Sequence, residues 1–241
     1  MSIAIHNIGG FMINNYVLDT PLGLIAIDTG FPGGEKCFLH RLDRLGGVQK
    51  LRYIFLTHAH DDHAGFLQAL LNLADHAQVV LHPLAVPRLK TGRNEEPPGA
   101  GYATRLAALF SLVKKDFGFP PADVADRAVL VSPPDGGFFK SLGLPIEILF
   151  LKGHTPDSIG LYLPETGDLF CGDAAMNLVL SLGHHTIWIE DVPAFSRSWD
   201  AMLSLNPIRI LPAHGKPFPP TDLQKYRRFM DGRSLIVPKK Q

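Results

Sequence analysis

The sequence predicts an α+β fold of two β-sheets packed face to face, with helices on the outer faces. Short apolar segments rich in β-forming residues fall into two groups, one before residue 83 and one from residue 128 onward, and segments with helical spacing accompany both groups. The 241 residues are 46% hydrophobic, which is ordinary for a globular protein. We therefore expect a single domain over residues 1–241.

The first group of segments supplies strands and two helices. We expect the strands at 2–8, 11–18, 23–28, 51–56 and 78–82. Pro21-Leu22-Gly23 predicts a turn between the second and third of them. Apolar residues recur with helical spacing over 35–45, where Gly46-Gly47 ends the helix, and again over 66–74.

A helical insertion is expected at about residues 83–134, between the two groups. Residues 88–100 are polar and contain proline and glycine, whereas the apolar residues that follow share one helical face. These residues are Tyr102, Leu106, Leu109, Phe110, Val113 and Phe117. A helix packed statically on the core and a mobile cover are equally compatible with this pattern.

The second group supplies further strands and two more helices. We expect the strands at 128–131, 146–150, 158–163, 168–172 and 208–211. Asp191 predicts the start of a helix over 192–205. Thr221 and Gln224 have the spacing of a capping box, so we expect the last helix to begin there and to end at Gly232.

Charge and cysteine content exclude several kinds of partner and site. Acidic and basic residues number 23 each, which gives no electrostatic reason for binding nucleic acid or an anionic membrane. The expected partner is a small-molecule substrate, and the oligomeric state stays open, with a homodimer among the alternatives. Cys37 and Cys171 indicate neither a disulfide framework nor a thiolate zinc site. Because no leader or membrane-spanning segment is apparent, we expect a cytoplasmic protein.

The most informative segment is the run Thr57-His58-Ala59-His60-Asp61-Asp62-His63-Ala64-Gly65. Its imidazoles and carboxylates are the ligands that a borderline cation such as Zn²⁺ prefers. The run follows an expected strand, where open α/β sheets place their ligands. In an extended segment His58, His60 and Asp62 point the same way, while His63 turns toward a second position. One segment can therefore serve two metal ions.

Three more candidate ligands stand at junctions between strands and loops, namely His154, Asp173 and His214, and each has a glycine beside it. Together with the first run, these residues make the chain resemble the metallo-β-lactamase fold superfamily. The resemblance begins at Asp28-Thr29-Gly30 and continues to His214, with the ligands in the order and approximate spacing of the family. It covers nearly the whole chain and is specific for the fold, though not for a substrate.

This resemblance implies a four-layer αββα sandwich with a binuclear metal site in its edge cleft. The two divalent metal ions are expected to be zinc, with iron and manganese as alternatives that the same ligands tolerate. The implied ligands are His58, His60 and His154 for the first ion, Asp62, His63 and His214 for the second, and Asp173 as a bridge between them. Asp28 is expected to brace the ligand loop without binding metal.

Hydrolysis is the chemistry that such a centre implies. A hydroxide that bridges the two ions attacks a carbonyl carbon, and Asp62 is the expected catalytic residue because it can orient the hydroxide and pass on its proton. We expect a small ester, thioester or lactone as the substrate, as in the glyoxalase II and lactonase branches that the pattern resembles. Asp173 argues against a true β-lactamase. Met176 stands where the lactonases typically carry a catalytic tyrosine, and Tyr102 is a candidate replacement donor.

Other functions on the same fold stay open. A mononuclear iron persulfide dioxygenase and a phosphodiesterase are the enzymatic alternatives, and a non-catalytic binding module is the third. An apolar substrate wall or plain core is expected for Phe138, Phe139, Met176, Ile187 and Trp188. His184-His185 is either a solvated pair or an imidazole source near the cleft, and Cys171 is expected to be a buried small hydrophobe.

Overall fold

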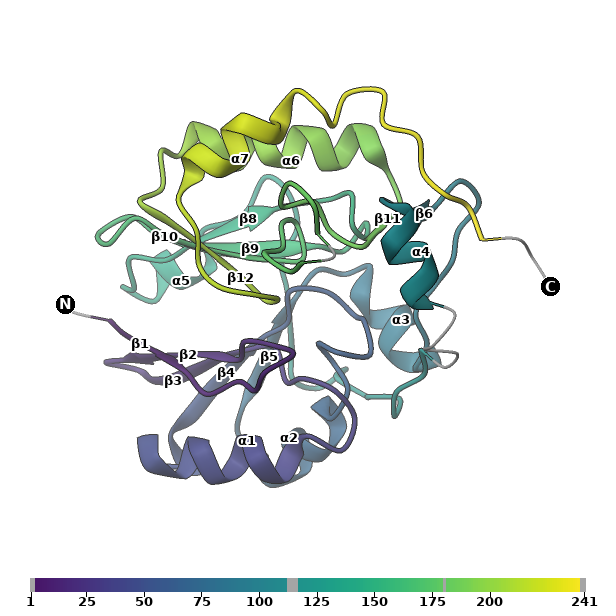
Figure 1. Cartoon of the computed structure of the whole chain (residues 1–241). Coiled ribbons are helices and arrows are strands. Elements are labelled where there is room, and N and C mark those ends of the chain that lie inside the picture. The colour runs from purple at the N-terminus through teal and green to yellow at the C-terminus, as the bar shows by residue number, and fades with distance from the viewer. Residues whose placement is uncertain (1–2, 112–116, 180, 239–241) are drawn as a thin grey trace. The chain divides into compact units, whose positions relative to one another are not determined.

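The computed structural model describes residues 3–111, 117–179 and 181–238 and divides into two compact units. The first unit comprises Met1–Asn94 and Phe117–Ser132, and the second comprises Glu95–Asp116 and Pro133–Gln241. Each unit contains both helices and strands (Figure 1). The expected insertion at 83–134 is thereby divided between the two units. That the two units act as one domain stays a prediction.

The first unit contains a six-stranded sheet in the order β1-β2-β3-β4-β5-β7. Its strands are β1 (Ala4–Asn7), β2 (Tyr16–Thr20), β3 (Gly23–Ile27), β4 (Leu51–Phe55), β5 (Gln78–Leu81) and β7 (Ala128–Leu130). The first three strands are antiparallel neighbours, whereas β3, β4, β5 and β7 run parallel. The carboxyl ends of the parallel strands therefore lie at one edge, and the loops after β3 and β4 begin there.

Helices connect the parallel strands of the first unit, as parallel pairing requires. They are α1 (Glu35–Leu42), α2 (Leu67–Leu73) and α3 (Ala85–Thr91), with short 3-10 turns at Asp43–Leu45 and Val48–Lys50. Figure 1 shows α1 and α2 on the same face of the sheet. Phe38 and Leu42 of α1 and Leu70 of α2 pack in one apolar cluster with Ile54 and Val79 of the sheet. This packing fixes the strand ends that carry the first candidate ligands.

The second unit contains a four-stranded sheet in the order β12-β10-β9-β8 and a small sheet of β11 and β6. The strands are β6 (Gly101–Tyr102), β8 (Glu147–Phe150), β9 (Ile159–Leu163), β10 (Asp168–Gly172), β11 (Trp188–Ile189) and β12 (Arg209–Pro212). β10 pairs parallel with β12 and antiparallel with β9, and β9 pairs antiparallel with β8. β8, β10 and β12 therefore run in the same direction, and their carboxyl ends lie at one edge.

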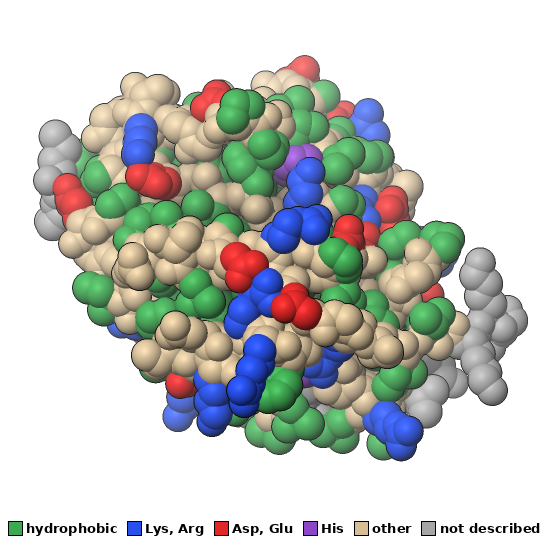
Figure 2. All heavy atoms as spheres, turned by 90° about the horizontal axis from the view of Figure 1, so that it is seen from above, with side chains coloured by type: hydrophobic (Ala, Val, Ile, Leu, Met, Phe, Trp, Pro, Cys, Tyr) green, Lys and Arg blue, Asp and Glu red, His purple; other side chains and the backbone are tan. Residues whose placement is uncertain are grey.

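The helices of the second unit are α4 (Arg105–Ser111), α5 (Phe138–Ser141), α6 (Val192–Ser204) and α7 (Pro220–Arg227). α6 and α7 lie side by side over the four-stranded sheet (Figure 1). α6 begins as expected, because the Asp191 carboxylate accepts a hydrogen bond of 2.9 Å from the Ala194 amide. Phe195 and Trp199 of α6 pack in one core cluster with Ile210 of β12. On the outer face, basic and acidic side chains lie next to each other (Figure 2).

Two expected elements have other bounds in the structure than the sequence predicts. The strand expected at 11–18 begins only at Tyr16, because the chain first makes a loop in which the Phe11 side chain is fully exposed, at 100%. The last helix begins at Pro220 without a side-chain cap, so the expected capping box at Thr221 and Gln224 does not form, and it ends at Arg227, before the expected Gly232. Proline, whose φ is already close to the helical value, starts this helix instead.

The long helical face expected from Tyr102 to Phe117 is also wrong in part. Tyr102 lies in β6, where pairing with Trp188 of β11 overrides its helical spacing. The helix α4 is short, and Leu106 and Leu109 on it are exposed. Val113 lies outside the described residues. No helix among the described residues has the length and apolar character needed to cross a membrane.

Candidate metal centre

In the first unit, the ligand run follows β4 directly and its imidazoles pack against one another. The ring centroids of His58 and His60 are 4.7 Å apart, and those of His58 and His63 are 3.9 Å apart. All three rings are buried, whereas Asp62 keeps 19% of its side chain exposed. His63 Nε2 lies 3.6 Å from Asp62 Oδ1. That separation is too long for a hydrogen bond but close to the roughly 3.4 Å between two ligands on one zinc ion with bonds of about 2.0–2.1 Å.

Asp28 braces this ligand run, as the resemblance implies. It follows β3 and adopts a positive φ of 60°, which aspartate tolerates better than most residues. Its Oδ1 accepts a hydrogen bond of 2.7 Å from the Thr57 amide, and its Oδ2 accepts one of 2.7 Å from the Thr57 hydroxyl. The same Oδ2 lies 2.7 Å from His63 Nδ1. With Nδ1 engaged by the carboxylate, His63 presents Nε2 toward Asp62.

Asp28→Asn is expected to lower the free energy of unfolding by about 1–3 kcal/mol, because a buried network loses its charged acceptor. Asparagine also tolerates a positive φ, so the substitution tests the carboxylate rather than the backbone. Urea unfolding of metal-free protein measures the change. The matched control is Asp19→Asn, at an exposed position of β2, where we expect no measurable loss. Equal stability of both variants would contradict the bracing role.

Asp61, the other carboxylate of the run, has a structural role. Its Oδ1 accepts a hydrogen bond of 2.8 Å from Asn94 Nδ2, and its amide donates one of 2.9 Å to Asn94 Oδ1. This reciprocal pair ties the ligand run to residues 33 positions further along the chain. The sequence carried no sign of the Asn94 contact, because a pair so distant along the chain leaves no local pattern.

The second unit gathers the other three candidate ligands at one sheet edge. His154, Asp173 and His214 follow β8, β10 and β12, the three strands that share a direction, and all are buried. Asp173 Oδ2 lies 3.6 Å from His154 Nε2, and Asp173 Oδ1 lies 3.6 Å from His214 Nε2. One carboxylate thus directs one oxygen toward each imidazole. This is the arrangement that a bridging ligand requires.

The orientation of His154 is set by the loop that precedes α6. His154 Nδ1 donates to the backbone oxygen of Trp188 at 2.8 Å and lies 3.3 Å from the Thr186 hydroxyl. A backbone carbonyl at Nδ1 fixes the tautomer that leaves Nε2 to face Asp173. Thr186 and Trp188 are supports that sequence analysis did not assign, because nothing in their spacing relates them to His154.

Two glycines beside the ligands are required by close backbone approaches, as expected. Gly153 has a φ of 134°, and a Cβ there would overlap the backbone of Phe195 in α6. Gly215 has a φ of 90°, and a Cβ there would overlap the carbonyl of Asn177. Larger residues at these positions would displace His154 and His214, their neighbours in sequence.

The pair His184-His185 is not solvated, which corrects one of the two alternatives. The His184 ring stacks on Phe218 with centroids 4.1 Å apart, and its Nδ1 donates to the Met176 carbonyl at 3.1 Å. His185 is only 3% exposed, and its Nε2 accepts a hydrogen bond of 2.9 Å from Arg233 Nη2. Both imidazoles therefore serve packing and hydrogen bonding within the second unit.

The stability of the protein should depend on pH through His185. Burial, and secondarily the positive charge of Arg233, lower the pKa of His185 from 6.5 to about 4. Its stabilising contribution is therefore complete above pH 6.5 and falls as the pH drops to about 4, by about 3 kcal/mol in all. Urea unfolding of metal-free protein at pH 7, 5.5 and 4 should show this loss, and His185→Gln should remove it. An unchanged pH slope in His185→Gln would contradict the assignment.

The expected apolar wall is partly core. Met176 and Phe139 are buried, whereas Phe138, Ile187 and Trp188 are half-buried. Tyr102, the candidate replacement donor, packs edge to face against Trp188 with ring centroids 5.1 Å apart. Cys171 is buried as expected, and burial raises the pKa of its thiol, which makes it a poor nucleophile.

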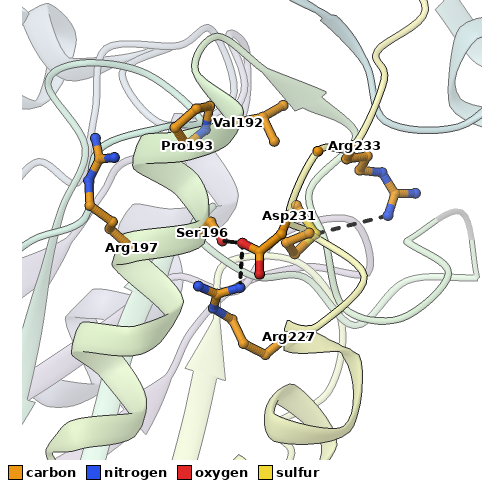
Figure 3. A pocket seen from close by; sticks show the side chains of 9 residues that line it. Val192, Pro193, Ser196, Arg197, Arg227, Asp231 and Arg233 are labelled. Carbon is orange, nitrogen blue, oxygen red and sulfur yellow. Dashed lines mark hydrogen bonds and ion pairs between the residues drawn. The ribbon is translucent and has the colours of Figure 1, made fainter.

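A separate cavity of about 390 Å³ opens between the start of α6 and the segment after α7 (Figure 3). None of the candidate ligands lines it. Arg227 is one of its lining residues and pairs with Asp200 at 2.6 Å and with Asp231 at 2.8 Å. The Ser196 hydroxyl and Arg227 hold the pKa of Asp231 below its usual range. The charges on this side of the cavity are therefore satisfied internally, and the cavity is distinct from the ligand sets.

The donor sets of both units fit a divalent transition metal. Together they offer only imidazole nitrogens and carboxylate oxygens, which zinc, iron and manganese all accept. The structure brings together His58, His60, Asp62 and His63 in the first unit and His154, Asp173 and His214 in the second. That these seven side chains bind metal stays a prediction.

The sequence profile of the metallo-beta-lactamase superfamily matches residues 8–214, a range that contains all seven candidate ligands. Among curated relatives, a beta-lactamase-like protein 2 homolog of Caenorhabditis elegans is 28% identical over 87% of this chain and 59% of its own length. The probable metallo-hydrolase YflN of Bacillus subtilis is 25% identical over 88% of this chain and 84% of its own. An atrochrysone carboxyl ACP thioesterase of Claviceps purpurea is 26% identical over 84% of this chain and 50% of its own length. The chain thus spans only 59% and 50% of the length of two of these relatives.

Solved structures agree on the fold. An archaeal metallo-beta-lactamase superfamily protein from Sulfolobus tokodaii superposes with a TM-score of 0.66 at 18% identity, over 100% of this chain and 91% of its own. A protein solved in a di-iron-bound form superposes with a TM-score of 0.62 at 24% identity, over 92% of this chain and 96% of its own. These likenesses confirm the expected fold class, the metallo-β-lactamase fold. The chain belongs to the metallo-β-lactamase superfamily, the family that its ligand pattern resembles.

Proposed function

We propose that this protein hydrolyses a small ester, thioester or lactone at a centre that holds two divalent metal ions. The proposed ligands are His58, His60 and His154 for one ion, Asp62, His63 and His214 for the other, and Asp173 between them. The observation that carries the proposal is the Asp173 carboxylate, whose two oxygens face two different imidazoles at 3.6 Å. A carboxylate so arranged suits a pair of ions better than a single one.

The two ligand sets come from different units, so the proposal includes their joint use at one centre. It is supported by the family match, whose range of residues 8–214 includes both sets. The two sets are also complementary. The first unit offers a run with one partly exposed carboxylate, and the second offers the carboxylate suited to bridging. In this proposal the two units act as one domain.

When bound, the two ions would lower the pKa of a water molecule toward neutrality and polarise the carbonyl to be attacked. The residues of the chain supply the rest. Asp62, whose side chain is 19% exposed, can orient the attacking water and accept its proton, then return the proton to the leaving oxygen or sulfur. Asp28 keeps His63 in the tautomer that presents Nε2, and the Trp188 carbonyl does the same for His154.

The choice of substrate class is supported by the relatives. One of them is named as a thioesterase and another as a probable metallo-hydrolase. Thioesters, esters and lactones share a carbonyl carbon that water attacks and a leaving group that needs one proton, so the same residues serve all three. We propose zinc as the metal, because five of the seven proposed ligands are imidazoles, which suit zinc better than manganese. The di-iron form of one solved relative makes iron the first alternative.

The test begins with metal-free protein reloaded with Zn²⁺, Fe²⁺ or Mn²⁺ separately. Each form is assayed with an acyl thioester, a set of lactones, a simple aryl ester and an aryl phosphodiester, and oxygen uptake is followed with glutathione persulfide. We expect turnover of a thioester, ester or lactone that a chelator abolishes and added metal restores. Oxygen uptake with persulfide, cleavage of the phosphodiester alone, or metal-loaded protein without any turnover would each overturn the proposal.

A further inference from the structure

The segment that follows α7 is hydrogen-bonded into the small sheet of β6 and β11. The Ile236 amide donates to the Tyr102 carbonyl at 2.9 Å, and the Tyr102 amide donates to the Ile236 carbonyl at 2.9 Å. Tyr102 pairs in turn with Trp188 of β11 on its other side. Ile236 therefore extends this small sheet beyond β6, and the segment after α7 is connected through β6 to β11, whose Trp188 carbonyl orients His154.

Arg233, in the same segment, connects the residue after β6 to His185 through its side chain. Its Nη2 donates to the Ala103 carbonyl at 3.0 Å and to His185 Nε2 at 2.9 Å, and its Nε donates to the same carbonyl at 3.3 Å. The Ala103 amide donates to the Ile187 carbonyl at 2.9 Å. Figure 3 shows the Arg233 side chain extending away from the Arg227–Asp231 pair. A planar guanidinium with several donors suits such a double contact, whereas a lysine offers a single point of attachment.

Residues 184–188, here called the support loop, carry the contacts of Arg233 to a metal ligand. His185 contacts Arg233 on one side of the loop. Thr186 and Trp188, its near neighbours, contact His154 Nδ1 at 3.3 Å and 2.8 Å. Hydrogen bonds and short backbone links thus join Arg233 to the ring of His154.

We propose that Arg233 is a positioning residue that holds the support loop so that His154 presents Nε2 to a metal ion. The inference rests on the proposed function, because His154 must be a ligand for its orientation to matter. Groups that orient a metal-binding histidine through its second nitrogen typically change metal affinity by about 10–100-fold when they are removed. Arg233 acts one step further away, through His185 and the loop backbone, and only on the ion that His154 holds.

The experiment titrates Zn²⁺ alone into metal-free protein in competition with a chelator of known affinity. The variants are Arg233→Met, which removes the donors but keeps the stem, and Arg233→Lys, which keeps the charge and one attachment. The matched control is Arg228→Met, because Arg228 lies on the same segment with its guanidinium 4.7 Å from the Phe229 ring centroid. The same variants are then loaded with Co²⁺, whose visible absorption reports the geometry of its ligands.

We expect the wild type to bind two equivalents of Zn²⁺. In Arg233→Met one equivalent should weaken by about 10-fold or more while the other keeps its affinity, and one set of Co²⁺ bands should shift. Arg233→Lys should recover part of the affinity, and Arg228→Met should match the wild type. If Arg233→Met folds, binds both equivalents at wild-type affinity and leaves the Co²⁺ spectrum unchanged, the inference is overturned while the proposed function stands.

A wild type that binds no Zn²⁺ overturns the proposed function and this inference with it. If Arg233→Met does not fold, amide hydrogen exchange of the wild type, measured with and without Zn²⁺, tests the inference in its place. Because coupling between two sites is reciprocal, Zn²⁺ should slow exchange at the Tyr102 and Ile236 amides. Exchange rates at these amides that do not change with Zn²⁺ would overturn the inference.

Discussion

Asp62→Asn is expected to lower kcat by about 10²–10⁴-fold, because the asparagine cannot accept the proton of the attacking water. Asp62 is suited to this role by its position. Its carboxylate lies 3.6 Å from His63 Nε2, and it is the one partly exposed member of a run whose imidazoles are buried. Steady-state kinetics on the substrate found in the screen measures kcat, and metal analysis of the same samples shows whether the second ion is also weakened.

The matched control is Asp61→Asn, the same substitution at the preceding residue. Asp61 accepts from Asn94 and holds the run in place, and the amide oxygen of Asp61→Asn can still accept that hydrogen bond. We expect its kcat to stay within about tenfold of the wild-type value. A loss in Asp61→Asn as large as that in Asp62→Asn would show that charge in the run matters generally and that Asp62 has no special role.

Asp173→Asn is expected to reduce activity by on the order of 10³-fold or more, because both ions lose a shared ligand. The amide keeps the size of the side chain but replaces one of the two oxygens that face His154 and His214 with a nitrogen that does not bind metal. We also expect Zn²⁺ to raise the melting temperature of Asp173→Asn by clearly less than that of the wild type, because stabilisation by a ligand grows with its affinity and both ions have lost a shared ligand.

Metal-free protein supplies the control for that experiment. Without metal, Asp173→Asn should melt close to the wild type, since the substitution keeps the volume at a buried position. A large loss of stability in the metal-free variant would mean that Asp173 holds the fold together. Retained activity together with full thermal stabilisation by Zn²⁺ would mean that Asp173 does not bridge two ions.

The elements that could be predicted are those whose signal lies within a few neighbouring residues. The β10 strand contains the apolar run Leu169–Cys171, and the helix α6 has an N-cap aspartate, so the expected bounds of both lie within one residue of the observed ones. The ligand run is equally local, because all its donors lie within six positions. Strand order then explains why His154, Asp173 and His214 share an edge, since β8, β10 and β12 run in one direction.

What could not be predicted depends on contacts between distant residues. Tyr102 has helical spacing with its neighbours but pairs with Trp188, and only the folded chain places that partner beside it. Arg233 and His185 are 48 positions apart, and neither belongs to a recognisable motif. Apart from Asp28, the residues that orient the candidate ligands could therefore not be predicted, although the candidate ligands themselves stand out in the sequence. A single sequence records which donors are present but not which side chains orient them.

The central claim is that ligands from both units serve the same pair of ions, and counting bound Zn²⁺ in a double variant tests it most directly. His63 belongs to the first unit and His214 to the second, but both are assigned to one ion. His63→Ala, His214→Ala and the double variant should therefore each retain one tight equivalent of Zn²⁺, since the second substitution removes nothing further. A double variant that binds no Zn²⁺ while each single variant binds one equivalent would mean that each unit holds an ion of its own, and would contradict the account.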